Sequence, residues 1–105
     1  MLESLEKMLA AGKDSSMLRF GLGKGYLDAG DLLNAAVNLQ RCVEQDPTYS
    51  AAWKLLGKAL QASDEPERAR QAWEQGLVAA RNRGDKQAEK EMNVFLRKLD
   101  KASGE

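Results

Sequence analysis

The amino-acid sequence predicts an all-α protein made of six short helices. Apolar residues recur at intervals of three and four positions, as at Leu55, Leu56 and Ala59, and this spacing is typical of one face of a helix. No stretch alternates apolar and polar residues as a half-buried strand would. Turns rich in glycine and polar residues interrupt the helical pattern at 11–15, 28–31, 45–49, 62–66 and 81–85.

Each interruption contains a residue that can cap the helix after it. Serine and aspartate side chains accept hydrogen bonds from the free N–H groups of a first helical turn. Pro47 and Pro66 follow two of the candidates, and a proline in a first turn loses no hydrogen bond. Since the connections are short, we expect neighbouring helices to be antiparallel and to pair as hairpins. The capping candidates are Ser15, Asp31, Asp46, Glu65 and Asp85.

The first helix, expected over residues 1–12, carries charges at Glu3, Glu6 and Lys7 within its apolar pattern. It is therefore an amphipathic helix and not the apolar core of a signal peptide. No part of the chain approaches the roughly 20 consecutive apolar residues that span a bilayer. We expect a cytoplasmic protein that does not bind membranes.

Composition narrows the possible functions. The chain of 105 residues suits one domain, and its 16 basic and 16 acidic residues cancel. A neutral chain lacks the broad positive field that attracts nucleic acid, although a local basic patch is possible. Histidine is absent, which removes the commonest general base and metal ligand. Cys42 is the only cysteine, so we expect no intramolecular disulfide, no metal site and no cofactor.

The middle of the chain repeats after 34 residues. The first copy, at 16–49, contains R-x2-L-G-x2-Y, then A-x3-L and a proline. The second copy, at 50–83, contains W-x2-L-G-x2-L and then A-x3-W. The identical residues are Ser16 and Ser50, Leu22 and Leu56, Gly23 and Gly57, Lys24 and Lys58, and Ala35 and Ala69.

This pattern resembles the tetratricopeptide repeat, W-x2-L-G-x2-Y…A-x3-F…P over 34 residues. The two copies depart from it at Arg19, Leu60 and Arg81, where the family has an aromatic residue, a tyrosine and a proline. The resemblance implies a right-handed α-α superhelix of two helical hairpins, 16–49 and 50–83.

The flanking segments extend the resemblance. Shifting the apolar positions of the first copy back by 34 residues reaches Met1, Leu5 and Met8, so the N-terminal helix, 1–12, resembles the second half of a truncated repeat. Residues 85–101 would be a helix that caps the stack. Together these parts form a single domain over 1–101, followed by a disordered tail at 102–105.

Small residues mark where paired helices approach each other. Gly23 and Gly57, with alanines in the facing helices, leave room for large side chains such as Trp53 and Trp73. Cys42 is interpreted as a small core residue, because no histidine or second thiol is present to activate it.

The glycines Gly21, Gly23 and Gly25 also suggest a phosphate-binding loop. A dinucleotide fingerprint needs a third glycine where Tyr26 stands and a strand before it, and a phosphate-binding Walker loop needs a following Lys-Ser or Lys-Thr. Both are missing. In a helix, Gly21 and Gly25 each cost about 1 kcal/mol relative to alanine, which predicts that this helix is the least stable of the middle four.

No enzymatic constellation is predicted. Carboxylate pairs such as Glu89 with Glu91, or Asp64 with Glu65, stand in charged surroundings without a hydrophobic pocket to shift their pKa values. Single-stranded nucleic acid would need aromatic side chains that are free to stack on bases, whereas packing between the repeats accounts for both tryptophans.

The resemblance also implies a binding surface. In this family the first helix of each hairpin lines a concave groove that often holds a peptide. Lysines at the matching positions suit a peptide with carboxylates, although they equally suit a solvated helix face. The groove residues implied by this matching are Phe20, Lys24, Lys54, Lys58, Gln61 and Met92.

We therefore predict a protein–protein interaction module that binds a peptide or protein segment in its concave groove and exists as a monomer or weak homodimer. The alternative is a structural module that self-associates within a larger assembly through its outer face or its end helices. The apolar stripes of the N-terminal and C-terminal helices favour that alternative.

Overall fold

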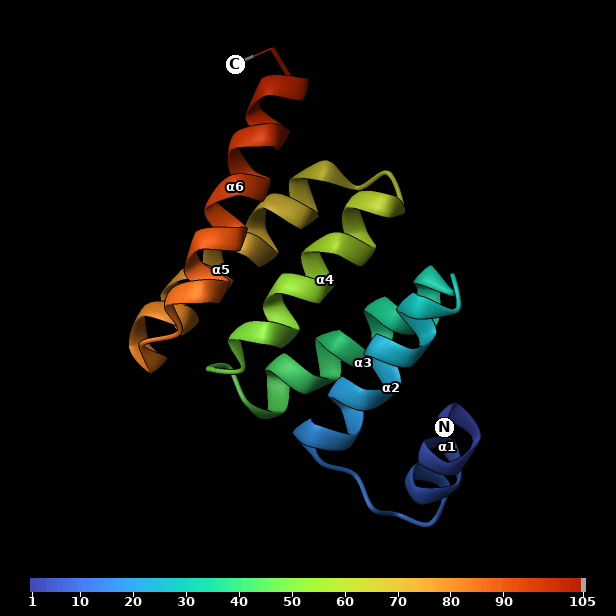
Figure 1. The fold of residues 1–105 in the computed structure, drawn as a ribbon. Coiled ribbons are helices and arrows are strands. Elements are labelled where there is room, and N and C mark those ends of the chain that lie inside the picture. Colours follow the sequence, from blue (N-terminus) through green and yellow to red (C-terminus); the bar gives the residue numbers. More distant parts are fainter. Residues whose placement is uncertain (105) are drawn as a thin grey trace.

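The computed structural model describes residues 1–104, and this part of the chain contains helices and turns but no strand. The predicted all-α fold is confirmed. None of the helices in this part is both long and apolar enough to cross a membrane. The helices are α1 (Leu2–Ala10), α2 (Ser16–Asp28), α3 (Leu32–Gln45), α4 (Ser50–Ala62), α5 (Pro66–Arg83) and α6 (Lys86–Ala102) (Figure 1).

The helices form two hairpins, α2 with α3 and α4 with α5 (Figure 1). Helix α4 packs against α3, so the second hairpin stacks on the first. Helices α2, α4 and α6 also contact one another in that order and form one layer of the molecule. Helices α1 and α6 lie at its opposite ends (Figure 1).

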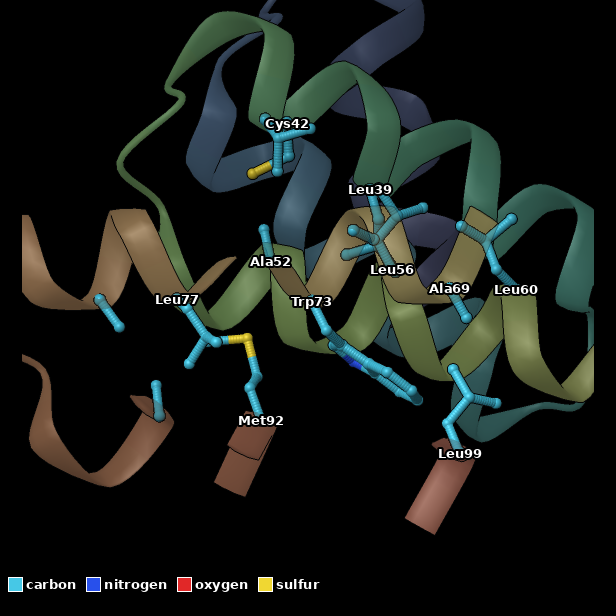
Figure 2. Close-up of a cluster of buried hydrophobic side chains, with 14 residues drawn as sticks. Leu39, Cys42, Ala52, Leu56, Leu60, Ala69, Trp73, Leu77, Met92 and Leu99 are labelled. Carbon is cyan, nitrogen blue, oxygen red and sulfur yellow. The ribbon is translucent and has the colours of Figure 1, made fainter. Parts of the chain in front are cut away.

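The core is centred on Trp73 of α5, whose side chain is fully buried. Figure 2 shows Trp73 in one cluster with Leu56, Met92 and Leu99, which come from α4 and α6. The indole Nε1 donates a hydrogen bond to the carbonyl of Lys54 at 3.1 Å, so burying its polar atom leaves no donor unpaired. Trp73 therefore ties α5 to both of its neighbouring helices.

Three of the five predicted caps form as expected. Ser15, Asp31 and Asp85 each accept a hydrogen bond from an N–H group in the first turn of α2, α3 and α6. Glu65 occupies the cap position of α5 but makes no capping hydrogen bond, while Pro66 is the first residue of that helix as expected.

The prediction that Asp46 and Pro47 begin a helix is wrong. Helix α4 begins three residues later, at Ser50, after Tyr49. Asp46 instead ends α3, and its carboxylate accepts hydrogen bonds from the N–H and hydroxyl groups of Thr48 at 3.1 and 2.7 Å. Aspartate forms such local turns as readily as it caps helices, so the residue type alone did not distinguish the two roles.

Two predicted ends also differ from the structure. Because α5 lacks the closing proline, it runs on through Arg81 to Arg83 and stops at Gly84, whose φ of 69° is left-handed. Helix α6, predicted to end at residue 101, extends one residue further to Ala102, and Ser103 and Gly104 donate backbone hydrogen bonds into its last turn. Residue 105 lies outside the described residues.

The glycines of α2 lie where two other helices approach it. A Cβ atom at Gly23 would lie 2.5 Å from Leu39 of α3, as the repeat pattern implies. A Cβ atom at Gly25 would lie 2.6 Å from Leu2, and one at Gly21 would lie 3.2 Å from Leu5. Both of these leucines belong to α1. The two glycines that the repeat pattern left unexplained therefore let α1 pack closely on α2.

Candidate functional site

The layer of α2, α4 and α6 presents the surface on which the predicted groove residues were expected. We use "inner face" for the surface of this layer that carries Phe20, Tyr49, Lys54, Lys58 and Phe95. Lys24 lies one turn after Phe20 on α2, and Gln61 lies one turn after Lys58 on α4. In the described chain, no hydrogen bond, ion pair or ring contact joins two of the six predicted residues.

Met92 is not a groove residue. Its side chain is fully buried, and its sulfur lies 2.4 Å from the position that a Cβ atom would take at Gly76. Met92 therefore fills the space between α5 and α6 that a glycine leaves open. Matching by repeat position placed it on the surface, whereas α6 turns this residue toward the core.

Lys54 is committed to an internal contact. Its Nζ lies 3.0 Å from Oε1 of Glu91, and the side chains are 23% and 36% exposed. This ion pair joins α4 to α6, because the two residues stand on neighbouring helices of the inner layer. An incoming carboxylate would have to compete with Glu91 for Lys54.

Lys58 lies beside an aromatic ring. Its Nζ is 5.0 Å from the centroid of the Phe95 ring, within the range in which a cation is attracted by the π-electrons. No carboxylate in the described chain forms an ion pair with Lys58. The side chain is exposed, so Lys58 can still meet a negative group from outside.

Phe20 stacks on Tyr49, with ring centroids 4.9 Å apart and planes at 21°. Both residues are half-buried, and the guanidinium of Arg83 lies 5.7 Å from the Tyr49 ring. Burial raises the pKa of the Tyr49 hydroxyl. Sequence reasoning missed Tyr49 because it lies in the turn before α4, where helical periodicity assigns no face.

Lys24 is held by a surface ion pair with Asp28, one turn away, at 3.3 Å. Both groups are more than half exposed, so water and salt screen this pair. Lys24 and Asp28 also border a hollow of about 340 Å³ between α1 and α2, whose floor includes Gly21 and Gly25.

A set of polar contacts joins the connections between helices. Arg19 pairs with Asp14 at 2.9 Å and donates to Oδ1 of the buried Asn38 at 3.0 Å. Ser50 donates to the carboxylate of Asp85 at 2.7 Å, and this bond lowers the pKa of that carboxyl. Arg19, a departure from the repeat pattern, therefore stabilises the first hairpin by pairing where the family uses an aromatic ring.

A larger hollow lies on the other side of the molecule. It has a volume of about 510 Å³ and lies between α3 and the turn that connects α4 to α5. Leu33 and Val37 line it, and they are 75% and 48% exposed. Sequence reasoning assigned these residues no role, because a single exposed leucine or valine on a helix is common.

The described residues contain no group of three or more acidic or cysteine side chains that could hold a metal ion. Cys42 is fully buried, and burial raises the pKa of its thiol to about 12. The reactive thiolate is therefore scarce at neutral pH.

Comparisons with known proteins agree with this architecture. Residues 26–89 match the model of a family described as tetratricopeptide repeat. The TPR repeat-containing protein PA0015 of Pseudomonas aeruginosa is 72% identical over 102 residues, which cover 97% of each chain.

Solved structures show the same likeness. The solution structure of protein BPP2914 from Bordetella parapertussis is 50% identical, with a TM-score of 0.83, and the match covers 97% of this chain and 89% of that one. A tetratricopeptide repeat domain protein from Salinibacter ruber has the same fold at 24% identity, with a TM-score of 0.77, over 83% of this chain and 97% of that one. The chain belongs to the tetratricopeptide repeat family.

Proposed function

We propose that this protein is a non-catalytic interaction module that holds a segment of a partner protein on its inner face. The observation that carries the proposal is the pair of aromatic sites on that face. One is the half-buried Phe20–Tyr49 stack between α2 and α4, and the other is Phe95 of α6 beside Lys58 of α4. Partly exposed rings offer large, rigid contact areas at a low cost in conformational entropy.

The ion pairs indicate where a partner's carboxylates would bind. Lys54 already pairs with Glu91, so an incoming carboxylate would first have to displace Glu91. Lys58 has no carboxylate partner among the described residues, and Lys24 has only the screened Asp28. We therefore assign the carboxylate contacts to Lys58 and Lys24, the ring contact to Phe20, and a hydrogen-bonding role to Gln61.

The proposal is tested with a Lys58→Glu variant. Affinity capture from lysate with the wild-type protein would identify the partner, and binding would then be measured by calorimetry with the purified segment. We expect Lys58→Glu and Phe20→Ala each to weaken binding by about tenfold or more, since each removes one central contact. Lys13→Glu, in the exposed turn before α2, is the matched charge control. Unchanged affinity in the Lys58 and Phe20 variants would exclude the inner face.

The second candidate function is self-association through the outer face. The exposed Leu33 and Val37, on one side of α3, favour it, because large exposed apolar side chains often mark interfaces. Light scattering over a concentration series would then show a mass above the 11.6 kDa of the monomer, and Val37→Lys would restore the monomer. A constant monomer mass in the wild type would exclude this function.

A further inference from the structure

The last helix carries a stripe of positive charge on the side that faces away from the core. The buried residues of α6 are Ala88, Met92 and Leu99. A helix turns by 100° per residue, so the exposed Lys86, Lys90, Arg97 and Lys101 fall on the opposite side, with Lys98 next to them. We use "basic face" for these five residues, Lys86, Lys90, Arg97, Lys98 and Lys101.

The charges of α6 are sorted by sign. Every acidic residue of the helix pairs with a cation of another helix: Glu89 with Arg81 at 2.9 Å, Glu91 with Lys54 at 3.0 Å, and Asp100 with Arg70. In contrast, none of the five cations of the basic face has a carboxylate partner within residues 1–104. The ion pairs with other helices neutralise the acidic residues of α6, whereas the five cations of the basic face remain unpaired on the surface of the described chain.

The basic face is also hollowed and has an apolar centre. One hollow of about 290 Å³ is bordered by Lys86, Lys90 and Arg97. A second, of about 500 Å³, is bordered by Arg97, Lys98 and Lys101 and contains the half-buried Val94. Arg97 belongs to both, so the two hollows adjoin along the helix.

A need for solubility does not explain this arrangement. The terminal helix of a repeat stack needs a polar outer face, but interspersed charges of both signs meet that need. Like charges four residues apart, such as Lys86 with Lys90 and Arg97 with Lys101, destabilise a helix. Lys86, at the start of α6, also opposes the helix dipole, although Lys101 in the last turn is favoured by it. The unpaired positive charge is therefore a cost that an external negative partner would remove.

We propose that the basic face binds an acidic amphipathic helix of a partner protein, which packs on α6 as the next helix of the stack. Each helix from α2 to α5 is packed between its neighbours, whereas α6 contacts only α4 and α5 among the described helices, and its opposite side is uncovered (Figure 1). An apolar residue of the partner would lie on Val94, and its carboxylates would meet the cations of the basic face. Opposite charges around an apolar contact fix the register of such a helix pair.

The same surface fits nucleic acid poorly. Glu89 borders one hollow and Asp100 borders the other, so carboxylates that are already paired interrupt the row of cations that a phosphate backbone running along the helix would follow. The residues that line the hollows include no aromatic side chain that could stack on bases. A protein helix can place uncharged residues opposite these two carboxylates.

The test uses a fluorescent peptide of about 17 residues, the length of α6, with leucines on one face and glutamates beside them. Its controls are a lysine-for-glutamate twin and a scrambled peptide of the same composition that cannot form an apolar face. We expect only the first peptide to bind, with NMR shifts confined to residues 86–101. Affinity should fall with rising salt, because these charges are exposed.

Two double variants separate this site from the inner face. Lys90→Glu with Arg97→Glu should weaken binding by at least about tenfold. Lys90→Ala with Arg97→Ala should also weaken binding, and because alanine favours a helix, this loss would not come from unfolding of α6. Lys24→Glu with Lys58→Glu, on α2 and α4, should leave it unchanged. Equal binding of the scrambled peptide, shifts on α2 or α4, or tighter binding of duplex DNA or phosphatidylserine vesicles would each overturn the proposal.

Discussion

Gly57 and Trp73 lie against each other between the two helices of the second hairpin. A Cβ atom at Gly57 would lie 2.1 Å from Nε1 of Trp73, and the indole cannot move away because it is fully buried and donates to the carbonyl of Lys54. The absence of a Cβ atom at Gly57 therefore allows the two helices of this hairpin to pack against each other. A Cβ atom at Gly21 would meet a different neighbour, a methyl group of Leu5 at 3.2 Å on the exposed helix α1.

We predict that alanine has opposite effects at these two glycines. Gly57→Ala should destabilise the protein by about 1–3 kcal/mol, the usual cost of overpacking a core. Gly21→Ala should be neutral or stabilising by up to about 1 kcal/mol, since alanine favours a helix and Leu5 can shift. Urea denaturation of both variants measures this. A Gly57→Ala protein as stable as the wild type would contradict the packing of Trp73.

Asp85 joins the second repeat to the last helix, and the pKa of its carboxyl is lower in the folded state than in the unfolded chain. Its pKa is lowered chiefly by the hydrogen bond from Ser50, and next by the N–H of Ala88. A carboxyl with a lowered pKa in the folded state stabilises that state at pH values above its ordinary pKa of about 3.9. This stability is lost as the pH falls through the lowered value.

We therefore predict that Asp85→Asn is less stable than the wild type at pH 7, and that the difference shrinks as the pH falls below about 4. Urea denaturation midpoints at pH 7 and pH 3 provide the measurement. Ser50→Ala serves as a partner variant, because removing the donor should raise the Asp85 pKa and flatten the same pH dependence. A difference that stays constant with pH would mean that the Asp85 charge plays no part.

Helix α2 is predicted to be the least stable of the four middle helices because of its glycine content. Gly21 and Gly25 each cost about 1 kcal/mol relative to alanine within a helix. The covering helix α1 has no buried residue of its own, so its contribution to the stability of α2 is small. The glycines that admit α1 therefore also loosen the helix that α1 covers.

Hydrogen exchange should detect this difference between helices. We predict that the amides of α2 exchange faster than those of α3, α4 and α5, because local opening exposes little apolar area. Replacing both Gly21 and Gly25 would not be a fair test, since a Cβ at Gly25 would meet Leu2 at 2.6 Å. Gly21→Ala alone should slow exchange throughout α2. Slower exchange in wild-type α2 than in α4 would contradict the prediction.

Helices and their pairing were predictable because apolar periodicity and the 34-residue repeat both report on packing. The start of α4 was not predictable, because Asp46 forms a turn, and aspartate occurs both in such turns and as a helix cap. The role of Gly21 and Gly25 also could not be found from the repeat, since it depends on which side of α2 contacts α1.

The candidate site was predicted less well than the fold, for the same kind of reason. Position in the repeat placed Met92 on the surface although it is buried, and gave no sign that Glu91 would occupy Lys54. Ion pairs between helices depend on the relative rotation of those helices, which a residue pattern does not contain. Tyr49 lies in a turn and so fell outside the pattern altogether.

At the scale of the whole molecule, α1 and α6 lie at the opposite ends of the described helices (Figure 1). By the 34-residue repeat pattern, α1 is expected to correspond to the second helix of a hairpin and α6 to a first helix. The exposed side chains at the two ends differ in kind. Met1 and Met8 of α1 are 97% and 43% exposed, whereas the uncovered side of α6 carries the basic face. Stacked end to end, two copies would bring apolar methionines against unpaired cations.

This mismatch predicts that the basic face prevents end-to-end assembly. Burying these cations without carboxylate partners would cost more free energy than the burial of the methionine side chains would gain. We therefore expect that Lys90→Leu with Arg97→Leu converts α6 into a surface that accepts α1 of another copy, and that Lys24→Leu on α2, as the matched control, does not. Because such a contact joins two different surfaces, it leaves a free end on each copy and does not stop at a dimer. Light scattering on the leucine variant should show a mass that keeps rising with concentration instead of levelling at a dimer. A variant that stays at 11.6 kDa would show that something other than the cations keeps the ends apart.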